Sequence, residues 1–138
     1  MTGAQRKQFF EMRKALDGFV AKIADSPAEI NENPAAIRLW HEGVFAVDDV
    51  RMFEDNPYKC VQAHDSTGNP GWSPKVASLW MQYHGTSKET ARPWIQPTGA
   101  HDMYKENEYI IWEDKIYRCI SDTTYSPNEY AANWEVVK

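Results

Sequence analysis

The sequence lacks several features on which common protein functions depend. Its 15 Lys and Arg are outnumbered by 20 Asp and Glu, giving a net charge of −5. The basic residues do not cluster either, so we expect no nucleic-acid partner. There is no apolar run of membrane-spanning length, and the mean hydropathy is −0.67, so we expect no membrane insertion. The polar, charged N-terminus does not resemble a signal peptide, which predicts synthesis in the cytoplasm.

Motifs for catalysis, metals and cofactors are also missing. The sequence contains no Gly-rich phosphate loop, no nucleophile elbow and no Cys-x-x-Cys pair. Asp48 and Asp49 are adjacent, so on a strand they would point to opposite faces and could not act as a paired acid and base. The histidines are far apart in sequence: His41, His64, His84 and His101. We therefore expect a protein that is not an enzyme and has neither a metal site nor a cofactor.

A pattern of aromatic, acidic and cysteine residues occurs twice in the chain. Val50 to Val61 reads VRMFEDNPYKCV, and Tyr109 to Ile120, fifty-nine residues later, reads YIIWEDKIYRCI. Each segment is followed by an aromatic-Ser-Pro triplet and then by a tryptophan: Trp72-Ser73-Pro74 with Trp80, and Tyr125-Ser126-Pro127 with Trp134. Such a duplication predicts two copies of one small module.

The chain has two cysteines, Cys60 and Cys119, at equivalent positions of the two copies. Equivalent positions in separate modules seldom face each other. We therefore expect two buried core thiols and no disulfide bond between them.

The alternation of short β-type runs with acidic turns predicts the fold class. We expect an α+β protein with an N-terminal helical segment at 1–39. Two small, mostly antiparallel β modules should follow, module 1 at 40–84 and module 2 at 92–138, joined by a polar linker.

The N-terminal segment predicts a helix over residues 5–25. Its apolar positions follow the a/d spacing of a heptad: Phe9, Met12, Leu16, Phe19 and Ile23. Two interpretations are open for this stripe. The helix could lie on its own domain, or it could form a short parallel bundle that makes the chain a homo-oligomer, with a trimer favoured because its seam carries large aromatic residues.

Aromatic residues make up 13% of the chain, including six Trp and seven Tyr. A chain of low mean hydropathy has few aliphatic side chains with which to cover so many rings. We expect some rings to remain at the surface and to serve binding.

The repeated residues resemble the carbohydrate-binding modules of families 5 and 12, which bind chitin and cellulose. In module 1 the resemblance rests on Phe45, Asp49-Val50, Tyr58-x-Cys60, His64, Trp72-x-Pro74 and Leu79-Trp80. In module 2 it rests on Tyr104, Glu108-Tyr109, Tyr117-x-Cys119, Tyr125-x-Pro127 and Trp134. It covers roughly residues 40–138 and leaves the N-terminal helix outside.

The resemblance implies a binding site as well as a fold. The family's ring before x-Pro contacts the ligand, which points to Trp72 in module 1 and Tyr125 in module 2. His64 belongs to the same motif and completes the predicted carbohydrate-binding residues, although module 2 has Thr123 in its place. Where the family usually has Gly, this chain has Asp48 and Asn107, residue types that tolerate a left-handed backbone.

The segment from Trp94 to Asp102 resembles the linker of phage and prophage tail-associated proteins. With the modules, it predicts non-catalytic binding of a polysaccharide or cell-surface glycan, chitin-like or from the cell wall. The protein would act on a virion or at a bacterial surface as a tail accessory protein, among other tail proteins. One alternative is a structural virion protein whose modules are spacers or protein contacts without sugar binding. Another is an accessory domain that serves a separate hydrolase chain.

Overall fold

Helix α1 spans Gly3–Ile23 in the structure, a computed structural model that describes residues 2–137. Thr2 caps this helix, because the Gln5 backbone N–H donates to its Oγ1 while its own N–H donates to Gln5 Oε1. Helix α2 (Pro27–Glu32) follows at once, with Pro27 in its first turn and Ser26 as its cap. The short 3₁₀ helix η1 (Pro34–Ala36) leads into the strands.

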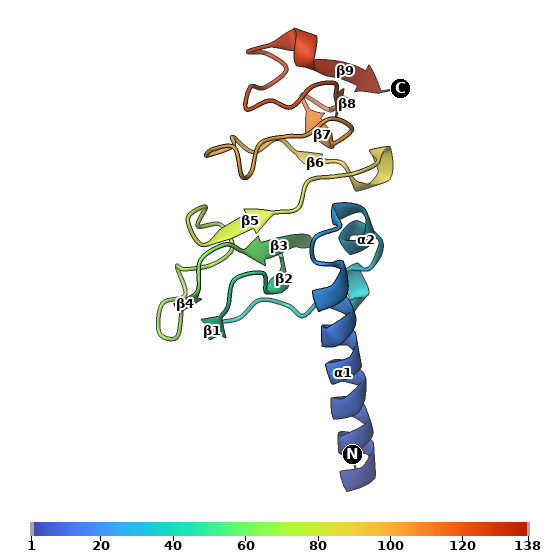
Figure 1. The fold of residues 1–138 in the computed structure, drawn as a ribbon, viewed down its shortest axis with the longest axis vertical. Helices are drawn as coiled ribbons and strands as arrows, with labels where there is room; N and C mark the ends of the chain where they lie inside the picture. Colours follow the sequence, from blue (N-terminus) through green and yellow to red (C-terminus); the bar gives the residue numbers. More distant parts are fainter. Residues whose placement is uncertain (1, 138) are drawn as a thin grey trace. The chain divides into compact units, whose positions relative to one another are not determined.

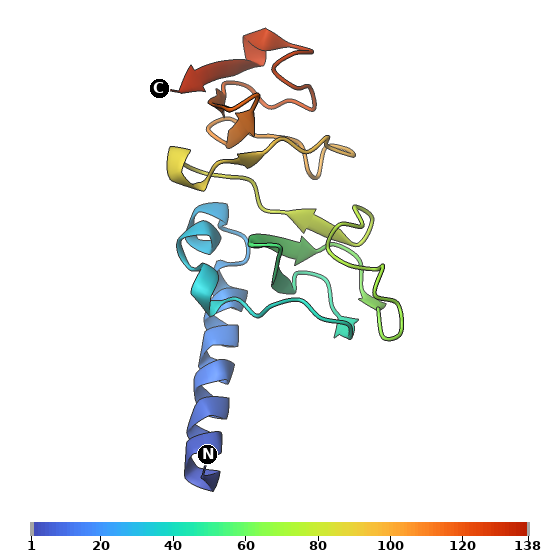
Figure 2. The same ribbon diagram turned by 180° about the vertical axis from the view of Figure 1, so that it is seen from behind.

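The described chain divides into two units, Met1–Met81 and Gln82–Lys138. Unit 1 contains α1, α2, η1 and two small sheets (Figure 1). Within this unit α1 extends away from the strands, and the view from behind shows the same arrangement (Figure 2). Val20 and Ile23, near the end of α1, are buried.

The sheets of unit 1 are short. Strand β1 (Val44–Phe45) pairs antiparallel with β4 (His64–Asp65). The three-stranded sheet has the order β2-β3-β5, formed by Val50–Phe53, Asn56–Cys60 and Trp80–Gln82.

Unit 2 contains one four-stranded sheet of order β6-β7-β8-β9. The strands span Arg92–Pro93, Tyr109–Trp112, Lys115–Cys119 and Trp134–Val137. The first pair is parallel and the other two are antiparallel. An N-terminal helical segment followed by small, mostly antiparallel sheets confirms the predicted α+β fold class.

The residues between the predicted modules have defined structure. The 3₁₀ helix η2 (Lys88–Thr90) lies in this segment. A further 3₁₀ helix, η3 (Ala131–Asn133), directly precedes β9. Gly85 bridges to Tyr109 of β7, and a Cβ atom at Gly85 would stand 2.5 Å from the carbonyl oxygen of Thr90. The segment thus packs on the sheet of unit 2, and this close backbone approach requires glycine.

The repeat in the sequence is also a repeat in the backbone. The hairpins β2–β3 and β7–β8 have the same register, with Val50 opposite Lys59 and Tyr109 opposite Arg118. Both hairpins turn on two residues with positive φ: Glu54 and Asp55 at 50° and 66°, and Glu113 and Asp114 at 48° and 63°. Left-handed backbone at both loop residues is the pattern of a type I′ hairpin turn.

Each module has a core built around a cysteine and a tryptophan at equivalent positions of the repeat. Module 1 buries Phe45, Tyr58, Cys60 and Trp80, and module 2 buries Tyr104, Ile110, Cys119 and Trp134. Both cysteines are free and buried, as predicted. Burial raises the pKa of both thiols, to about 11 for Cys119.

A second pair of equivalent tryptophans is Trp40 and Trp94. The backbone N–H of Trp40 donates to Met52 O, and that of Trp94 donates to Ile111 O, the matching residue. Both indoles meet an aromatic ring edge-on, Phe53 at 5.7 Å and Trp112 at 6.3 Å. Trp94 is therefore a framework residue of module 2.

The backbone before each hairpin is left-handed at Asp48 (φ 75°) and Asn107 (φ 71°). The N–H groups of these residues donate to the carbonyl oxygens of Cys60 and Cys119. The expectation that Asp and Asn take over the conformation of a glycine here is confirmed.

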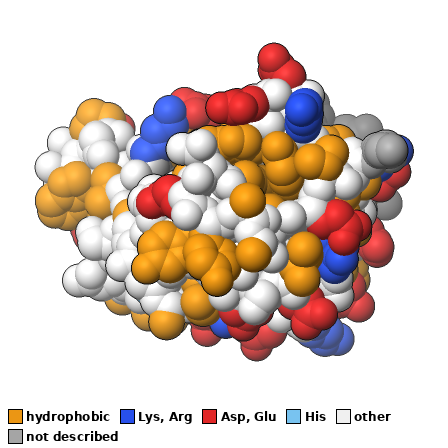
Figure 3. Space-filling model, turned by 90° about the horizontal axis from the view of Figure 1, so that it is seen from above, with side chains coloured by type: hydrophobic (Ala, Val, Ile, Leu, Met, Phe, Trp, Pro, Cys, Tyr) orange, Lys and Arg blue, Asp and Glu red, His pale blue; other side chains and the backbone are white. Residues whose placement is uncertain are grey.

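Among the described residues, no helix is long and apolar enough to cross a membrane. On the face drawn in Figure 3, Lys and Arg are scattered among Asp and Glu, so the described atoms there form no continuous basic surface. Hydrophobic side chains lie in several groups on the same face.

Candidate functional site

Most aromatic rings of the two modules belong to their cores, and the exceptions define the candidate site. Of the Phe, Trp and Tyr side chains in residues 40–137, three are exposed: Trp72, Tyr125 and Tyr130, at 45%, 54% and 52% of their surface. Two of them are the rings that the sequence predicts as binding residues. In both modules the proline two positions later, Pro74 or Pro127, is buried. The loop is therefore anchored through its proline while the ring faces solvent.

The backbone around Tyr125 is held by hydrogen bonds to core residues. The Tyr125 N–H donates to Oγ1 of the buried Thr123, and the indole Nε1 of Trp134 donates to the Tyr125 carbonyl oxygen at 2.9 Å. Ser126 and Glu129 cap each other, since each backbone N–H donates to the other's side chain. Gln96 Nε2 also donates to Thr124 O. The ring therefore projects from a backbone that is fixed before any ligand arrives.

Trp72 lies at the end of a longer polar loop. Its N–H donates to Asn69 O, and Asn69 in turn donates to the carbonyl of the buried Ser66. Gly68 has a φ of 78°, and its N–H donates to Glu42 Oε1. Trp80, the counterpart of Trp134, has a buried Nε1 without a hydrogen-bond partner in the described part of the chain. The bond that fixes Tyr125 to the core of its module thus has no equivalent for Trp72.

His64 lies against the core of module 1. Its ring is 5.6 Å from the Phe45 ring and 5.8 Å from the Trp80 ring. Nδ1 lies 2.6 Å from Gln62 O, and Nε2 is buried without a hydrogen-bond partner among residues 2–137. His64 is half-buried, its ring packs on two core rings and its Nε2 is buried, so its place is that of a framework residue.

Tyr130 is an exposed ring that sequence reasoning missed. Its ring centroid lies 6.3 Å from that of Tyr125, with 36° between the ring planes. Module 1 has no aromatic residue between Trp72 and Trp80, so the duplication gives no signal for it. The signal in the sequence is a lone aromatic in the polar run that follows Tyr125-Ser126-Pro127.

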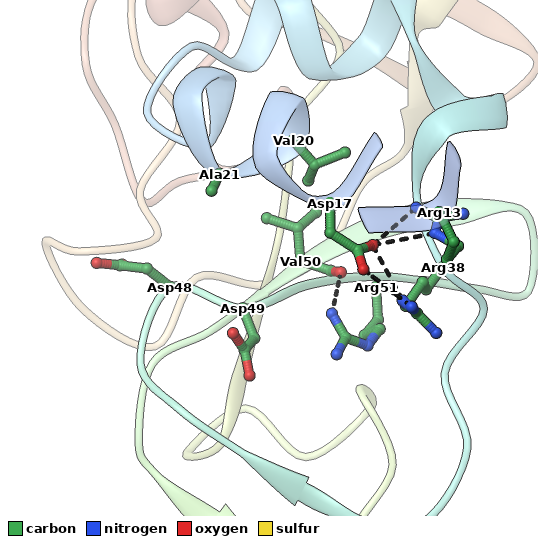
Figure 4. Close-up of a pocket in the computed structure, with 9 residues that line it drawn as sticks. All are labelled: Arg13, Asp17, Val20, Ala21, Arg38, Asp48, Asp49, Val50 and Arg51. Atoms are coloured by element: carbon green, nitrogen blue, oxygen red, sulfur yellow. Dashed lines mark hydrogen bonds and ion pairs between the residues drawn. The ribbon is translucent and has the colours of Figure 1, made fainter. Parts of the chain in front are cut away.

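Unit 1 also contains a polar pocket of about 260 Å³ between α1 and β2 (Figure 4). Six of its nine lining residues are charged: Arg13, Asp17, Arg38, Asp48, Asp49 and Arg51. Asp17 lies at the centre of the dashed contacts and accepts from both Arg13 and Arg38. The lining thus has three positive and three negative charges.

The charges of this pocket hold α1 to η1 and the segment that follows it. Arg38 binds both carboxylate oxygens of Asp17, and Arg13 also donates to Ala36 O. The hydrogen bonds from Arg38 hold the pKa of Asp17 below its usual value; partial burial opposes the shift and Arg13 adds to it. Arg51 donates to Val50 O and lies 5.2 Å over the Phe45 ring. These arginines serve packing and anchoring, and we assign no ligand to the pocket.

His84, Glu108 and Tyr104 form a further polar cluster, in unit 2. His84 Nδ1 lies 2.8 Å from Glu108 Oε1, and its ring stacks on Tyr104 at 3.9 Å. Burial raises the pKa of Tyr104, and its hydroxyl oxygen accepts a hydrogen bond from the Ile95 N–H. Within residues 2–137, no group of three or more His, Cys, Asp or Glu side chains is placed to hold a metal ion.

Comparison with known protein families and with curated proteins finds no match to this chain.

Proposed function

We propose that the protein binds a polysaccharide or cell-surface glycan without catalysis, through Trp72 and Tyr125. The observation that carries the proposal is a selective exposure. In each module the aromatic residue before Ser-Pro is exposed, while the core rings of the same repeat are buried. A folded chain buries rings where it can, so two exposed rings at equivalent positions favour a binding role over chance.

The chemistry suits sugar recognition. The C–H face of a pyranose stacks on a flat aromatic ring, and polar neighbours pair with its hydroxyl groups. Asn69 and Ser73 flank the Trp72 ring in sequence, and Thr124 and Asn128 flank the Tyr125 ring. A chitin-like or cell-wall glycan is the ligand that the resemblance to carbohydrate-binding modules of families 5 and 12 favours.

We further propose that α1 makes the chain a homo-oligomer, with a trimer favoured. Four of the five predicted seam residues are exposed within one chain: Phe9, Met12, Leu16 and Phe19. Ile23, the fifth, is buried with Val20 in unit 1, so the rest of the predicted seam is left exposed within one chain. Water-exposed aromatic rings along a helix are stabilised when other copies cover them. Weak sugar sites would then act together through avidity.

The setting that we propose is a phage or prophage tail, where such an oligomer would meet the bacterial surface. It rests on the resemblance of the segment 94–102 to tail-protein linkers. The competing function is a structural virion protein whose modules are spacers, and the binding experiment distinguishes the two.

The experiment is a pull-down of the pure protein on insoluble chitin, cellulose and bacterial cell walls. The variants are Trp72→Ala, Tyr125→Ala and the double substitution. Val44→Ala and Val136→Ala serve as matched controls, because they remove exposed apolar side chains on strands of the same modules. We expect the controls to bind like the parent and the double variant to lose binding by tenfold or more. A folded parent that binds none of these polymers would contradict glycan binding and favour the structural function.

A further inference from the structure

The two modules present different aromatic surfaces. Module 1 exposes one ring, Trp72, and has no aromatic residue between it and Trp80. Module 2 exposes two rings, Tyr125 and Tyr130, whose centroids are 6.3 Å apart. The duplication therefore conserved the framework and made the binding surfaces unequal.

The second ring of module 2 is fixed by the same loop as the first. The Tyr130 N–H donates to the carbonyl oxygen of Ser126, and the Asn133 N–H donates to that of Tyr130. Ser126 is buried at 3% exposure. Both phenol rings thus project from one hydrogen-bonded loop, and a ligand that covers both orders little further backbone.

We infer that Tyr130 is a second sugar-contacting residue and that it forms with Tyr125 a two-ring site for two consecutive pyranose units of a glycan chain. This inference rests on the proposed function. One pyranose is about as large as one phenol ring, so a monosaccharide covers Tyr125 or Tyr130 but not both. The 36° tilt between the ring planes suits two linked sugars whose faces are turned relative to each other.

The charge of the loop limits the ligand. The charged residues between Cys119 and Trp134 are Asp122 and Glu129, both acidic. Asp122 pairs with Lys105 at 3.8 Å, so the like charge that an anionic polymer would meet beside the rings comes from Glu129, and an uncharged chain would not be repelled. The site therefore takes an uncharged disaccharide unit within a longer chain, while Trp72 offers one ring for one sugar.

The test is an NMR titration of the full chain in a Trp72→Ala background, which leaves module 2 as the site to be measured. The probes are N-acetylglucosamine and its β-1,4-linked dimer to hexamer, with the corresponding glucose series beside them. We expect the dimer to bind several-fold more tightly than the monosaccharide. Adding Tyr130→Ala should weaken the dimer roughly three- to tenfold and leave the monosaccharide unchanged. Tyr130→Phe should bind like the background, because it keeps the ring, and so should the control Val136→Ala.

The outcomes separate this inference from the proposed function. If the Trp72→Ala protein binds oligomers and Tyr130→Ala changes nothing, the two-ring site is wrong while glycan binding stands. If the parent binds but Trp72→Ala abolishes all binding, module 2 has no site and the inference again fails alone. If the folded parent binds no sugar in the titration or on insoluble polymers, both proposals fail.

Discussion

The indole Nε1 of Trp134 donates a hydrogen bond to the carbonyl oxygen of Tyr125 at 2.9 Å. Trp134 is buried and Tyr125 is exposed, so this bond joins the core of module 2 directly to its candidate binding ring. The bond also satisfies an N–H group that would otherwise be buried without a partner, which is the situation of Trp80 in module 1.

Replacing Trp134 by Phe should therefore cost more than the loss of ring volume. The variant leaves the Tyr125 carbonyl without its donor, and the lost hydrogen bond costs ~1 kcal/mol of the free energy of unfolding. Trp80→Phe is the matched control, since it removes an N–H group without a partner in the described chain. Hydrogen exchange at the Cys119 and Cys60 amides reports on each core separately. If Trp134→Phe and Trp80→Phe lower the protection of their own cores equally, the hydrogen bond to Tyr125 O contributes nothing to stability.

The hairpin turn of module 2 should be stabilised by a double substitution, E113N with D114G. Glu113 and Asp114 have φ values of 48° and 63°, and Asn-Gly is the pair that a type I′ turn prefers. Relief of the left-handed strain should add ~1 kcal/mol to the free energy of unfolding, measured with urea. The same change at Glu54 and Asp55 should gain less, because it removes the ion pair between Glu54 and Lys75. Destabilisation in both modules would contradict this account of the turns.

Acid should weaken the attachment of α1 through Asp17. The pKa of Asp17 is lowered in the folded chain, chiefly by hydrogen bonds from Arg38. A lowered folded pKa means that the contribution is fully present above the ordinary value of 3.8 and is lost as the pH falls through the folded value. Asp17→Asn should therefore cost stability at pH 7, by ~1 kcal/mol or less for so exposed a group, and progressively less in the acid range.

Urea unfolding of unit 1 at neutral and acid pH measures this difference. Asp25→Asn is the control, because Asp25 is 94% exposed and its contact with Lys59 is 3.7 Å long. We expect no change for it at either pH. An Asp17→Asn variant that stays equally destabilised in acid would show that its carboxylate charge is not the cause.

Charged residues in the exposed stripe of α1 should break the proposed oligomer. Phe9 and Met12 are 60% and 56% exposed in one chain, so Phe9→Lys with Met12→Lys should leave the fold of unit 1 intact. Sedimentation should show the parent associating with concentration and the variant remaining monomeric. Lys14→Ala is the control, because Lys14 lies on the opposite side of the helix at 100° per residue. A parent that stays monomeric at all concentrations would contradict self-association through α1.

The elements that the sequence predicts well depend on neighbouring residues. The apolar spacing of residues 5–25 predicted α1, and the acidic pairs at 54–55 and 113–114 predicted the hairpin turns. Backbone sterics and hydrogen bonds over a few residues decide such features, so a single sequence contains them. The framework rings Trp80 and Trp134 were likewise evident from the repeat.

Trp94 was harder to place, because the repeat is not gapless there. Trp40 precedes its partner Met52 by twelve residues, while Trp94 precedes Ile111 by seventeen. Because module 2 has extra residues here, aligning the two copies at a constant spacing of fifty-nine residues does not pair Trp40 with Trp94. Only the shared hydrogen bond and the shared ring contact identify the two tryptophans as one position.

The sequence by itself determined the helix, the two hairpins, the buried cysteines and the two loops that present Trp72 and Tyr125. Tertiary structure decided which rings reach solvent: it turned His64 toward Phe45 and Trp80, and it brought Tyr130 beside Tyr125. The physical reason is the separation in sequence of the residues that interact. Secondary structure follows from contacts within a few residues, whereas the exposure of a ring depends on every segment that packs around it, and those segments are distant in the chain.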